Sequence, residues 1–441
     1  MADQVGSSVK QAVRGPARRF LFLQGPHGPF FDRLARRLTA AGCACWRVGF
    51  NRGDQFFWSD RSRYIAHRGG AEDWPAHLRQ ILKAHQITDI VLYGDTRPIH
   101  ASAVRIARDA GLQVHVFEEG YLRPFWISYE RGGANGHSRL MEMSVADMKA
   151  ALAEQQQHDH IEAPAHWGDT RSHVFYGALY HALVLWANRS YAGFKPHRAL
   201  TVAQEFRLYL KRLLLMPAHW AALYAATRRI RRGGFAYHVA LLQLEHDASF
   251  LHHSGFSSMT EFLKVVIEGF ARGAPSHHHL VFKDHPLEDG RVPVRRAVAE
   301  LAQAHGIAGR VHYLRGGKLA PLLDGARSAV TINSTAGQQV LWRGLPLRAF
   351  GAAVYAKPEF VSHQPLAAFF AAPDRPDHDA YLTYRQYLLE TSQIPGGYYA
   401  ARNRAQLYRQ MIDIMLAPHD RYCSLGTADA APSQHLSLVQ S

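Results

Sequence analysis

The sequence is poor in cysteine and lacks long hydrophobic runs. Among its 441 residues only Cys43, Cys45 and Cys423 are cysteines, and the first two form C-A-C rather than a C-x-x-C motif. Three cysteines cannot build a disulfide framework, so we expect ordinary thiols in a reducing cytoplasm. No uninterrupted apolar run reaches the roughly 18 residues of a membrane-spanning helix. Residues 1–20 also lack the apolar core of a signal peptide, so neither a transmembrane segment nor secretion is predicted.

Acidic residues are few in comparison with basic ones. The chain contains 51 Lys and Arg against 36 Asp and Glu, a formal net charge of +15. Residues 195–232 hold nine of the basic residues and a single acidic one. A chain this basic is expected to meet anions, among them nucleic acids, phosphorylated donors and acidic membrane faces. A nucleic-acid binder is disfavoured, because the sequence has no helix-turn-helix signature, no RNP motif and no zinc-finger spacing.

Hydrophobic and charged residues occur in globular proportions, at 47% and 20%, which exclude a disordered chain. Short apolar segments alternate with helix-like ones. One series of strands is predicted at 20–23, 45–50, 88–93 and 113–117. A second series is predicted at 237–244, 279–283, 311–314 and 329–332. This alternation predicts an α/β fold with two doubly wound parallel sheets.

The same pattern divides the chain into five segments. Residues 18–140 are predicted to form an N-terminal Rossmann-like domain, and 235–382 a C-terminal one. Between them, 141–234 is expected to be a basic helical region attached to the N-terminal domain. Residues 383–418 are predicted to be C-terminal helices, and 424–441 a polar tail.

A glycine-rich turn follows the first predicted strand, at the strand end where parallel α/β sheets bind ligands. Gln24, Gly25 and Gly28 belong to this turn, whose backbone N–H groups can approach an anion or an acceptor. The turn has neither G-x-G-x-x-G nor P-loop spacing. An ordinary turn is therefore the alternative.

A pair of carboxylates, Glu118 and Glu119, ends another strand directly before Gly120. Mutual repulsion and partial burial are expected to raise the pKa of one of them and to suit it to work as base or nucleophile. Adjacent strand residues point to opposite faces, so one carboxylate is expected in the cleft. A solvated acidic turn is the alternative. Further candidates for the same cleft lie downstream: Arg123, Asn135 and His137.

A third motif places Lys283, His285 and Pro286 at the end of a strand in the second series. A residue before proline favours extended backbone, which would hold the imidazole out from the strand end. An imidazole beside a lysine suits a phosphate leaving group. A surface histidine is the alternative.

A fourth motif consists of Asn333, Ser334 and Thr335, at a predicted strand-to-helix junction. Small hydroxyl groups there can donate hydrogen bonds to a phosphate, with help from the helix N-terminus. Serine and threonine are also preferred as plain helix caps, which is the alternative.

Taken together, the motifs resemble the capsular polysaccharide biosynthesis and export proteins of the KpsS/LipB type, which are β-Kdo transferases. The resemblance covers most of residues 18–360, in order, through FLFLQGPHGPFFDRLARRL (20–38), FNRGDQFFW (50–58), VLYGDTRPIH (91–100), FEEGYLRPFWISYERGGANGHSRL (117–140), LLQLEHDASFLHHSGF (241–256), LVFKDHPLEDG (280–290) and VTINSTAGQQVLWRGLP (330–346). The acidic, His-Pro and Ser/Thr motifs are also similar to those of bacterial sialyltransferases, which use a CMP-sugar.

The resemblance implies a GT-B-type glycosyltransferase, with two Rossmann-like domains facing a cleft. The N-terminal domain would bind the acceptor and the C-terminal domain the nucleotide-sugar. The implied donor is CMP-Kdo, and the implied acceptor is a lysophosphatidylglycerol-type lipid on the inner face of the cytoplasmic membrane. The product would start the poly-Kdo linker of a capsule, with retention of the β configuration. No metal or cofactor is implied, and other capsule biosynthesis and export proteins are implied partners.

The resemblance also implies residue roles. Glu118 or Glu119 would be the nucleophile, and His285 and Lys283 would handle the CMP phosphate. The other implied donor-binding residues are Pro286, Asn333, Ser334 and Thr335. The implied acceptor side of the cleft contains Gln24, Gly25, Gly28, Gly120, Arg123, Asn135 and His137. The alternative is a non-catalytic export or assembly subunit, which needs neither paired carboxylates nor phosphate-binding loops.

Residues 205–232 interleave leucine and aromatic residues with basic clusters, and Pro217 is expected to divide the segment into two helices. Such a composition suits a helix lying on anionic lipid, where each basic residue adds about 1 kcal/mol. The alternative is a pair of core helices that pack on the first domain. A peripheral position on the inner membrane face is therefore our expectation.

We predict that the protein binds phosphatidylglycerol vesicles at low salt and is released as salt screens its charges. Replacing Arg228, Arg229, Arg231 and Arg232 together by Gln should reduce flotation with the vesicles and leave the protein folded. If the quadruple variant floats as well as the wild type, the arginine cluster is not the membrane contact.

Overall fold

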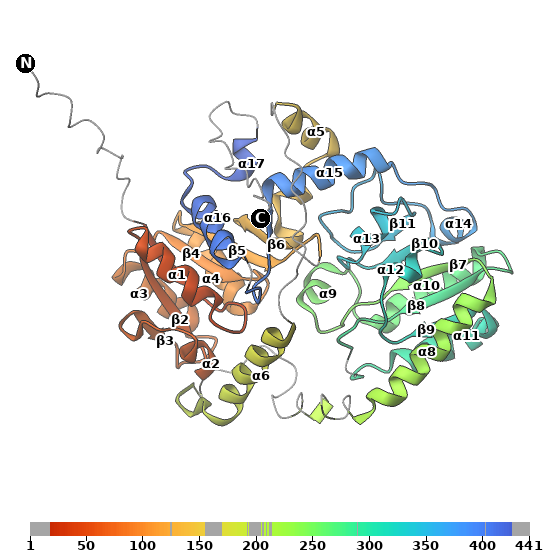
Figure 1. The fold of residues 1–441 in the computed structure, drawn as a ribbon, viewed down its shortest axis with the longest axis horizontal. Coiled ribbons are helices and arrows are strands. Elements are labelled where there is room, and N and C mark those ends of the chain that lie inside the picture. Colours follow the sequence, from red (N-terminus) through yellow and green to blue (C-terminus); the bar gives the residue numbers. More distant parts are fainter. Residues whose placement is uncertain are drawn as a thin grey trace, which may run out of the picture. The chain divides into compact units, whose positions relative to one another are not determined.

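The computed structural model describes residues 18–123, 126–154, 170–191, 193, 204, 207–208, 210, 214–288, 290–401 and 403–425 (Figure 1). The chain separates into two compact units. The first takes its described residues from Met1–Phe117, Asp169–Pro196 and Asn403–Leu416. The second takes them from Glu118–Gly168, His197–Arg402 and Ala417–Ser441.

A seven-stranded sheet has the order β12-β6-β5-β4-β1-β2-β3. The pairs joining β5, β4, β1, β2 and β3 are parallel, whereas β12 pairs with β6 in the antiparallel sense. The strands are β1 (Arg19–Phe22), β2 (Ala44–Gly49), β3 (Tyr64–Ala66), β4 (Asp89–Tyr93), β5 (Gln113–Glu119), β6 (Trp126–Arg131) and β12 (Gln393–Pro395). The helices of the first unit are α1 (Phe30–Ala40), α2 (Arg52–Phe56), α3 (Trp74–Ala84), α4 (Pro98–Asp109), α6 (Thr170–Trp186) and α16 (Arg404–Leu416).

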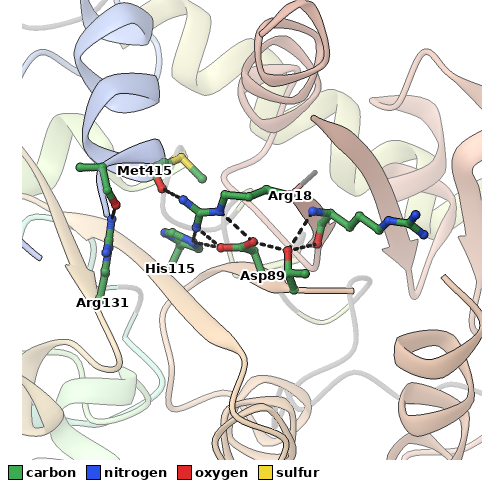
Figure 2. Close-up of polar contacts among 8 residues, drawn as sticks. Arg18, Asp89, His115, Arg131 and Met415 are labelled. Carbon is green, nitrogen blue, oxygen red and sulfur yellow. Dashed lines mark hydrogen bonds and ion pairs between the residues drawn. The ribbon is translucent and has the colours of Figure 1, made fainter. Parts of the chain in front are cut away.

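The first unit is closed by α16, a helix from late in the sequence. Figure 2 shows how Arg18, directly before β1, meets Asp89 at the start of β4 and donates a hydrogen bond of 2.5 Å to the Met415 carbonyl in α16. His115 in β5 lies 2.8 Å from the same carboxylate. Burial acts to raise the pKa of Asp89, but hydrogen bonds from His115 and Arg18 lower it to about 2. The Tyr408 hydroxyl of α16 also donates to the Phe30 carbonyl at 3.3 Å.

The second unit contains a five-stranded, all-parallel sheet of order β11-β10-β7-β8-β9. Its strands are β7 (Tyr237–Leu241), β8 (His279–Lys283), β9 (Val311–Leu314), β10 (Ala326–Thr331) and β11 (Leu347–Ala349). The helices of this unit are α5 (Val145–Ala153), α8 (Met216–Gly233), α9 (Ala248–His253), α10 (Met259–Gly273), α11 (Val294–Ala304), α12 (Ala320–Leu323), α13 (Gly337–Leu341), α14 (Leu366–Ala371), α15 (His378–Thr391) and α17 (Arg421–Ser424). Short 3₁₀ helices occupy Arg61–Arg63, Asn135–His137, Arg139–Met141, Asn188–Tyr191 and Ala308–Arg310.

A buried carboxylate joins β6 to the segments around it. Glu130 is 1% exposed and accepts hydrogen bonds from the hydroxyl groups of Tyr121, Ser138 and Tyr422. Burial raises the pKa of Glu130 to about 7, although the three hydroxyl donors oppose the rise. Because Tyr422 lies in α17, one carboxylate holds strand, loop and helix together.

The expectation of two α/β series is confirmed. All eight predicted strands exist, and β8 and β9 have the predicted bounds. Pattern reading missed β3, β11 and β12, each three residues long, and β6. The predicted helical region is divided, since α6 belongs to the first unit and α8 to the second. Residues 155–169 and 424–441 of the predicted segments lie wholly or mainly outside the described residues.

The helix α8 places an apolar side on the second unit. Leu223, Ala226 and Ile230 pack on its core, while Trp220 and Tyr224 are 70% and 68% exposed. Pro217 lies in the first turn of α8, where its missing N–H costs no helical bond. The expectation that this proline divides 205–232 into two helices stays a prediction, because much of the segment before α8 lies outside the described residues. Much of 195–213 and the Arg231 side chain lie outside the described residues. Among the described helices, none is both long enough and apolar enough to cross a bilayer.

Two histidines on neighbouring strands are stacked on Phe235. Nδ1 of His279 lies 2.8 Å from Nε2 of His312, and the Phe235 ring is 3.7 Å and 5.1 Å from the two imidazoles. Burial, aided by His279 and Arg229, lowers the pKa of His312 to about 4. The pKa of His279 is lowered by burial and by Arg310. Both rings therefore stay neutral in the folded protein near pH 7.

We predict that this pair makes the protein less stable in mild acid. Unfolded histidine has a pKa of about 6.5, so between that value and about 4 the unfolded chain binds more protons than the folded one. Stability is then lost as pH falls through this window. His312→Gln should reduce the difference in unfolding free energy between pH 7 and pH 5, measured by urea denaturation, whereas the exposed His305→Gln should not. An unchanged pH dependence in His312→Gln would contradict the assignment.

Candidate functional site

A pocket lies at the carboxyl edge of the five-stranded sheet. The register aligns Ala349, Thr331, Leu241, Lys283 and Leu314 in one row across all five strands. The loops that follow these residues therefore leave the sheet together. The pocket has a volume of about 430 Å³ and is lined by Leu122, Arg123, Trp126, Leu241, Leu242, Lys283, Asp284, His285, Pro286, Gly317, Leu319, Ser334, Thr335, Ala336, Gln338, Gln339, Trp342, Tyr381 and Arg385. All of these residues belong to the second unit.

Lys283 brings a buried ammonium group to this pocket. The residue is 5% exposed, and its Nζ donates to the Asp284 carbonyl at 2.9 Å. Burial lowers the pKa of Lys283, while the Asp284 carboxylate opposes that shift. The same carboxylate accepts hydrogen bonds from the Tyr313 hydroxyl and, at 3.0 Å, from the His285 N–H. Burial raises the pKa of Asp284 despite these bonds.

His285 is held as a neutral hydrogen-bond donor. Its Nδ1 accepts from the Leu287 N–H at 3.1 Å, which leaves the proton of the neutral ring on Nε2. Burial lowers the pKa of His285 to about 4; Asp247 opposes the shift, and Arg123 and Lys283 add to it. Near pH 7 the ring is therefore uncharged and can donate one N–H. The two cations that depress its pKa also line the pocket.

The loop after β10 is fixed by Asn333. This residue is 4% exposed, and its Nδ2 donates to the carbonyls of Ser249 and His253 at 2.9 and 3.0 Å. Its Oδ1 accepts from Gln243 Nε2 at 2.6 Å, and Gln243 Oε1 accepts from the Asn333 N–H at 2.9 Å. Asn333 does not line the pocket, but the next two residues, Ser334 and Thr335, do.

A tyrosine contacts the backbone on both sides of Thr335. The Tyr355 hydroxyl donates to the Ser334 carbonyl at 2.7 Å, and a Cβ on Gly337 would lie 2.7 Å from that hydroxyl oxygen. Only glycine fits this close approach. The helix that follows, α13, has five residues, and the Ser334 and Thr335 side chains are polar groups that the loop before it offers.

The paired carboxylates end β5 in the same unit as the pocket. The Glu119 N–H donates to Glu118 Oε2 at 3.3 Å, and the Tyr398 hydroxyl donates to the Glu118 carbonyl at 2.7 Å. Neither carboxylate is among the pocket-lining residues, although Leu122 and Arg123, a few residues on, are. Gly120 makes this turn possible, because a Cβ there would lie 2.3 Å from the Trp126 carbonyl oxygen.

The polar turn after β6 packs on α9. The Asn135 N–H donates to the Tyr121 hydroxyl oxygen at 2.7 Å, and the backbone of Asn135 has a φ of +53°. The His137 ring lies edge-on to His253 at 5.1 Å. Both residues are in the second unit, but neither lines the pocket.

The glycine-rich turn lies in the first unit. Gln24 is buried and donates to Asp54 Oδ2 at 3.0 Å. A Cβ on Gly25 would meet the Phe31 ring, and Gly28 has a φ of +111°. These residues shape a tight turn directly after β1.

Sequence reasoning missed several polar or aromatic groups of the pocket wall. Besides Trp126, Asp284 and Gln338, these are Gln339, Trp342, Tyr381 and Arg385. Trp342 lies close in sequence to the Ser334–Thr335 loop, which is a usable signal, but Tyr381 and Arg385 come from α15, which no motif marks. Within the described part of the chain, no group of three or more His, Cys, Asp and Glu side chains is placed to hold a metal ion.

A family model and two sequence relatives indicate one family. A family model described as capsule polysaccharide biosynthesis protein matches residues 88–399. The chain is 30% identical over 395 residues to the Escherichia coli capsule polysaccharide export protein KpsS, covering 87% of this chain and 97% of that protein. It is also 30% identical over 404 residues to the capsule polysaccharide modification protein LipB of Neisseria meningitidis serogroup B, covering 91% and 96%. Among solved structures, Thermosulfurimonas dismutans KpsC, a beta Kdo 2,7 transferase, is similar at 13% identity and a TM-score of 0.39, covering 83% of this chain and 98% of that one.

We predict that the pocket binds a sulfate ion more tightly as pH falls from 7 to 5. A bound anion raises the pKa of His285 above its unliganded value of about 4, so binding takes up a proton in this range. Calorimetric titration of sulfate, whose charge is constant over the range, measures the effect. His285→Gln should flatten the pH dependence, whereas the exposed His363→Gln should retain it. Equal slopes in both variants would show that His285 is not the titrating group.

Proposed function

The chain belongs to the capsule polysaccharide biosynthesis family, and on that premise we propose that it is a glycosyltransferase acting in capsule assembly. Its donor is CMP-Kdo, its acceptor a lysophosphatidylglycerol-type lipid, and its product the first unit of a poly-Kdo linker. The observation that carries the proposal is the pocket, which gathers Lys283, His285 and Arg123 with two hydroxyl side chains. The two α/β sheets are the components of the GT-B architecture that the family resemblance implies.

The pocket chemistry suits the phosphate of a nucleoside monophosphate. Lys283 and Arg123 supply positive charge, and His285 Nε2 supplies a neutral N–H donor. Ser334 and Thr335 add hydroxyl groups on a loop that is already fixed, so little ordering is required on binding. As the donor reacts, the CMP phosphate gains negative charge, and preorganised donors stabilise that charge most at this point.

Two successive displacements account for transfer with retained β configuration. In the first, the carboxylate of Glu118 or Glu119 forms a bond to the anomeric carbon of Kdo, and the bond to the CMP phosphate breaks with its electron pair going to phosphate. In the second, the acceptor hydroxyl oxygen bonds to the same carbon and the carboxylate leaves. The hydroxyl proton passes to a base, for which the other carboxylate is the nearest candidate in sequence. No metal or cofactor takes part.

The lipid acceptor places the protein on the inner face of the cytoplasmic membrane. The net charge of +15 and the exposed Trp220 and Tyr224 of α8 support peripheral attachment to anionic lipid. The glycine-rich turn of Gln24, Gly25 and Gly28 is proposed to serve the acceptor, as are Asn135 and His137. Other capsule biosynthesis and export proteins are the proposed partners.

The Escherichia coli relative KpsS is named a capsule polysaccharide export protein, and this name favours a second candidate function. In that role the chain would be a non-catalytic subunit of export or assembly. Hydrolysis of CMP-Kdo by the purified protein separates the two candidates, because a non-catalytic subunit would leave the nucleotide-sugar intact.

A direct assay tests the proposed function. The purified protein is incubated with CMP-Kdo and a fluorescent lysophosphatidylglycerol, and the lipid is analysed by mass spectrometry. A mass gain of one Kdo is the expected result. An unmodified lipid with intact CMP-Kdo would favour the export subunit.

We predict that the paired carboxylates are required for transfer. Glu119→Gln and Glu118→Gln are nearly isosteric changes that remove the negative charge, so at least one should abolish product formation without loss of the fold. Glu300→Gln, at an exposed ion pair on α11, is the matched control and should transfer normally. Near-normal transfer by both the Glu118→Gln and the Glu119→Gln variants would rule out a glutamate nucleophile at this position.

A further inference from the structure

Trp342 is an unusually exposed aromatic residue in the wall of the pocket. Its side chain is 50% exposed, whereas Trp126, Leu241 and Leu242 of the same wall are buried. Burying an indole face removes a large apolar area from water, so leaving it open in a concave site indicates a surface kept for a ligand. The planar shape of the ring limits which ligand groups it suits.

Arg385 holds the indole in place. Its guanidinium carbon lies 4.5 Å from the centre of the Trp342 ring, within the range of a cation–π contact, and it lines the same pocket. Buried hydrogen bonds join α13, which ends directly before Trp342, to α15, which carries Arg385. Gln338 Nε2 donates to the Tyr384 hydroxyl at 2.9 Å, and the Tyr381 hydroxyl donates to the Gln338 carbonyl at 3.0 Å. The position of the ring is therefore set before any ligand arrives.

The chain also fixes how far the ring lies from the phosphate-binding loop. Thr335 precedes α13 and Trp342 directly follows it, and the five residues of this helix advance the backbone by roughly 7 Å. A nucleoside 5′-monophosphate whose phosphate meets Thr335 and Lys283 extends a comparable distance to its base. The pocket volume of about 430 Å³ falls within the usual range for small-molecule sites.

We propose that Trp342, positioned by Arg385, is the nucleobase subsite of the pocket, on which the pyrimidine ring of the donor stacks. This inference rests on the proposed function, because it takes the ligand to be a pyrimidine nucleoside monophosphate. Bases stack on aromatic side chains through their π faces. Trp342 then makes the pocket bind nucleotides more tightly than phosphates that lack a base. The cationic groups alone contact only the phosphate and do not distinguish the two kinds of ligand.

Two ligands that differ only in the base test the proposal. Calorimetry compares CMP with ribose 5-phosphate, which has the same phosphate and sugar but no base. In the wild type, CMP should bind the more tightly. Trp342→Ala should weaken CMP binding roughly 10- to 100-fold, the range expected for a lost base stack, and should leave ribose 5-phosphate binding unchanged. Trp342→Phe should retain most of the CMP affinity, which separates loss of stacking from damage to the fold.

Control variants distinguish the possible failures. Trp186→Ala removes a tryptophan that is 79% exposed in α6 of the first unit and should change neither ligand. His285→Ala should weaken both ligands, because it removes a phosphate donor. If the wild type binds CMP no better than ribose 5-phosphate, the proposed donor is wrong. If the wild type prefers CMP but Trp342→Ala preserves that preference, or loses both ligands equally, the base subsite is wrong and the donor assignment stands.

Discussion

The parallel register of the five-stranded sheet is the constraint on which the candidate site depends. Backbone hydrogen bonds align Thr331, Leu241 and Lys283 in one row, so the loops that leave β10, β7 and β8 start side by side. Residues separated by about forty to ninety positions in sequence, such as Leu241, Lys283 and Ser334, thereby line one pocket. A shift of a single residue in any of these strands would move its loop and turn every side chain of the strand to the other face of the sheet.

Buried polar groups then set the shape of each loop. Asn333 and Gln243 hydrogen-bond to one another, and Asn333 also donates to neighbouring backbone carbonyls. These bonds fix the position of the loop that carries Ser334 and Thr335. Glu130 likewise fixes the segments around β6 by accepting hydrogen bonds from Tyr121 and Ser138. These two partners lie on either side of the stretch that carries Leu122 and Arg123. In both places a buried polar side chain makes hydrogen bonds to groups from separate elements. An apolar residue of similar size would leave those groups without hydrogen-bond partners.

Strand periodicity was sufficient to predict the long central strands and the helices between them, because β1, β4, β7 and β8 are continuous apolar runs buried on both faces. It failed at β3, β11 and β12, which are too short to show a period, and at β6, where a buried Glu130 reads as a solvent-facing residue. For the site, strand ends predicted Lys283, His285, Ser334 and Thr335 in one region. Trp342 and Arg385 were beyond reach, since their contact depends on how α13 and α15 pack.

The first unit is assembled from distant parts of the chain, since α16 closes it through the Arg18 and Phe30 contacts. A ribosome delivers α16 only after every strand of the five-stranded sheet has left the exit tunnel. During synthesis, the five-stranded sheet can therefore fold while the first unit still lacks α16. In that interval the Arg18 guanidinium and the Asp89 carboxylate are not yet covered by this helix. The nascent chain thus depends on a late helix to finish an early core, and chaperone contact is most needed in that interval.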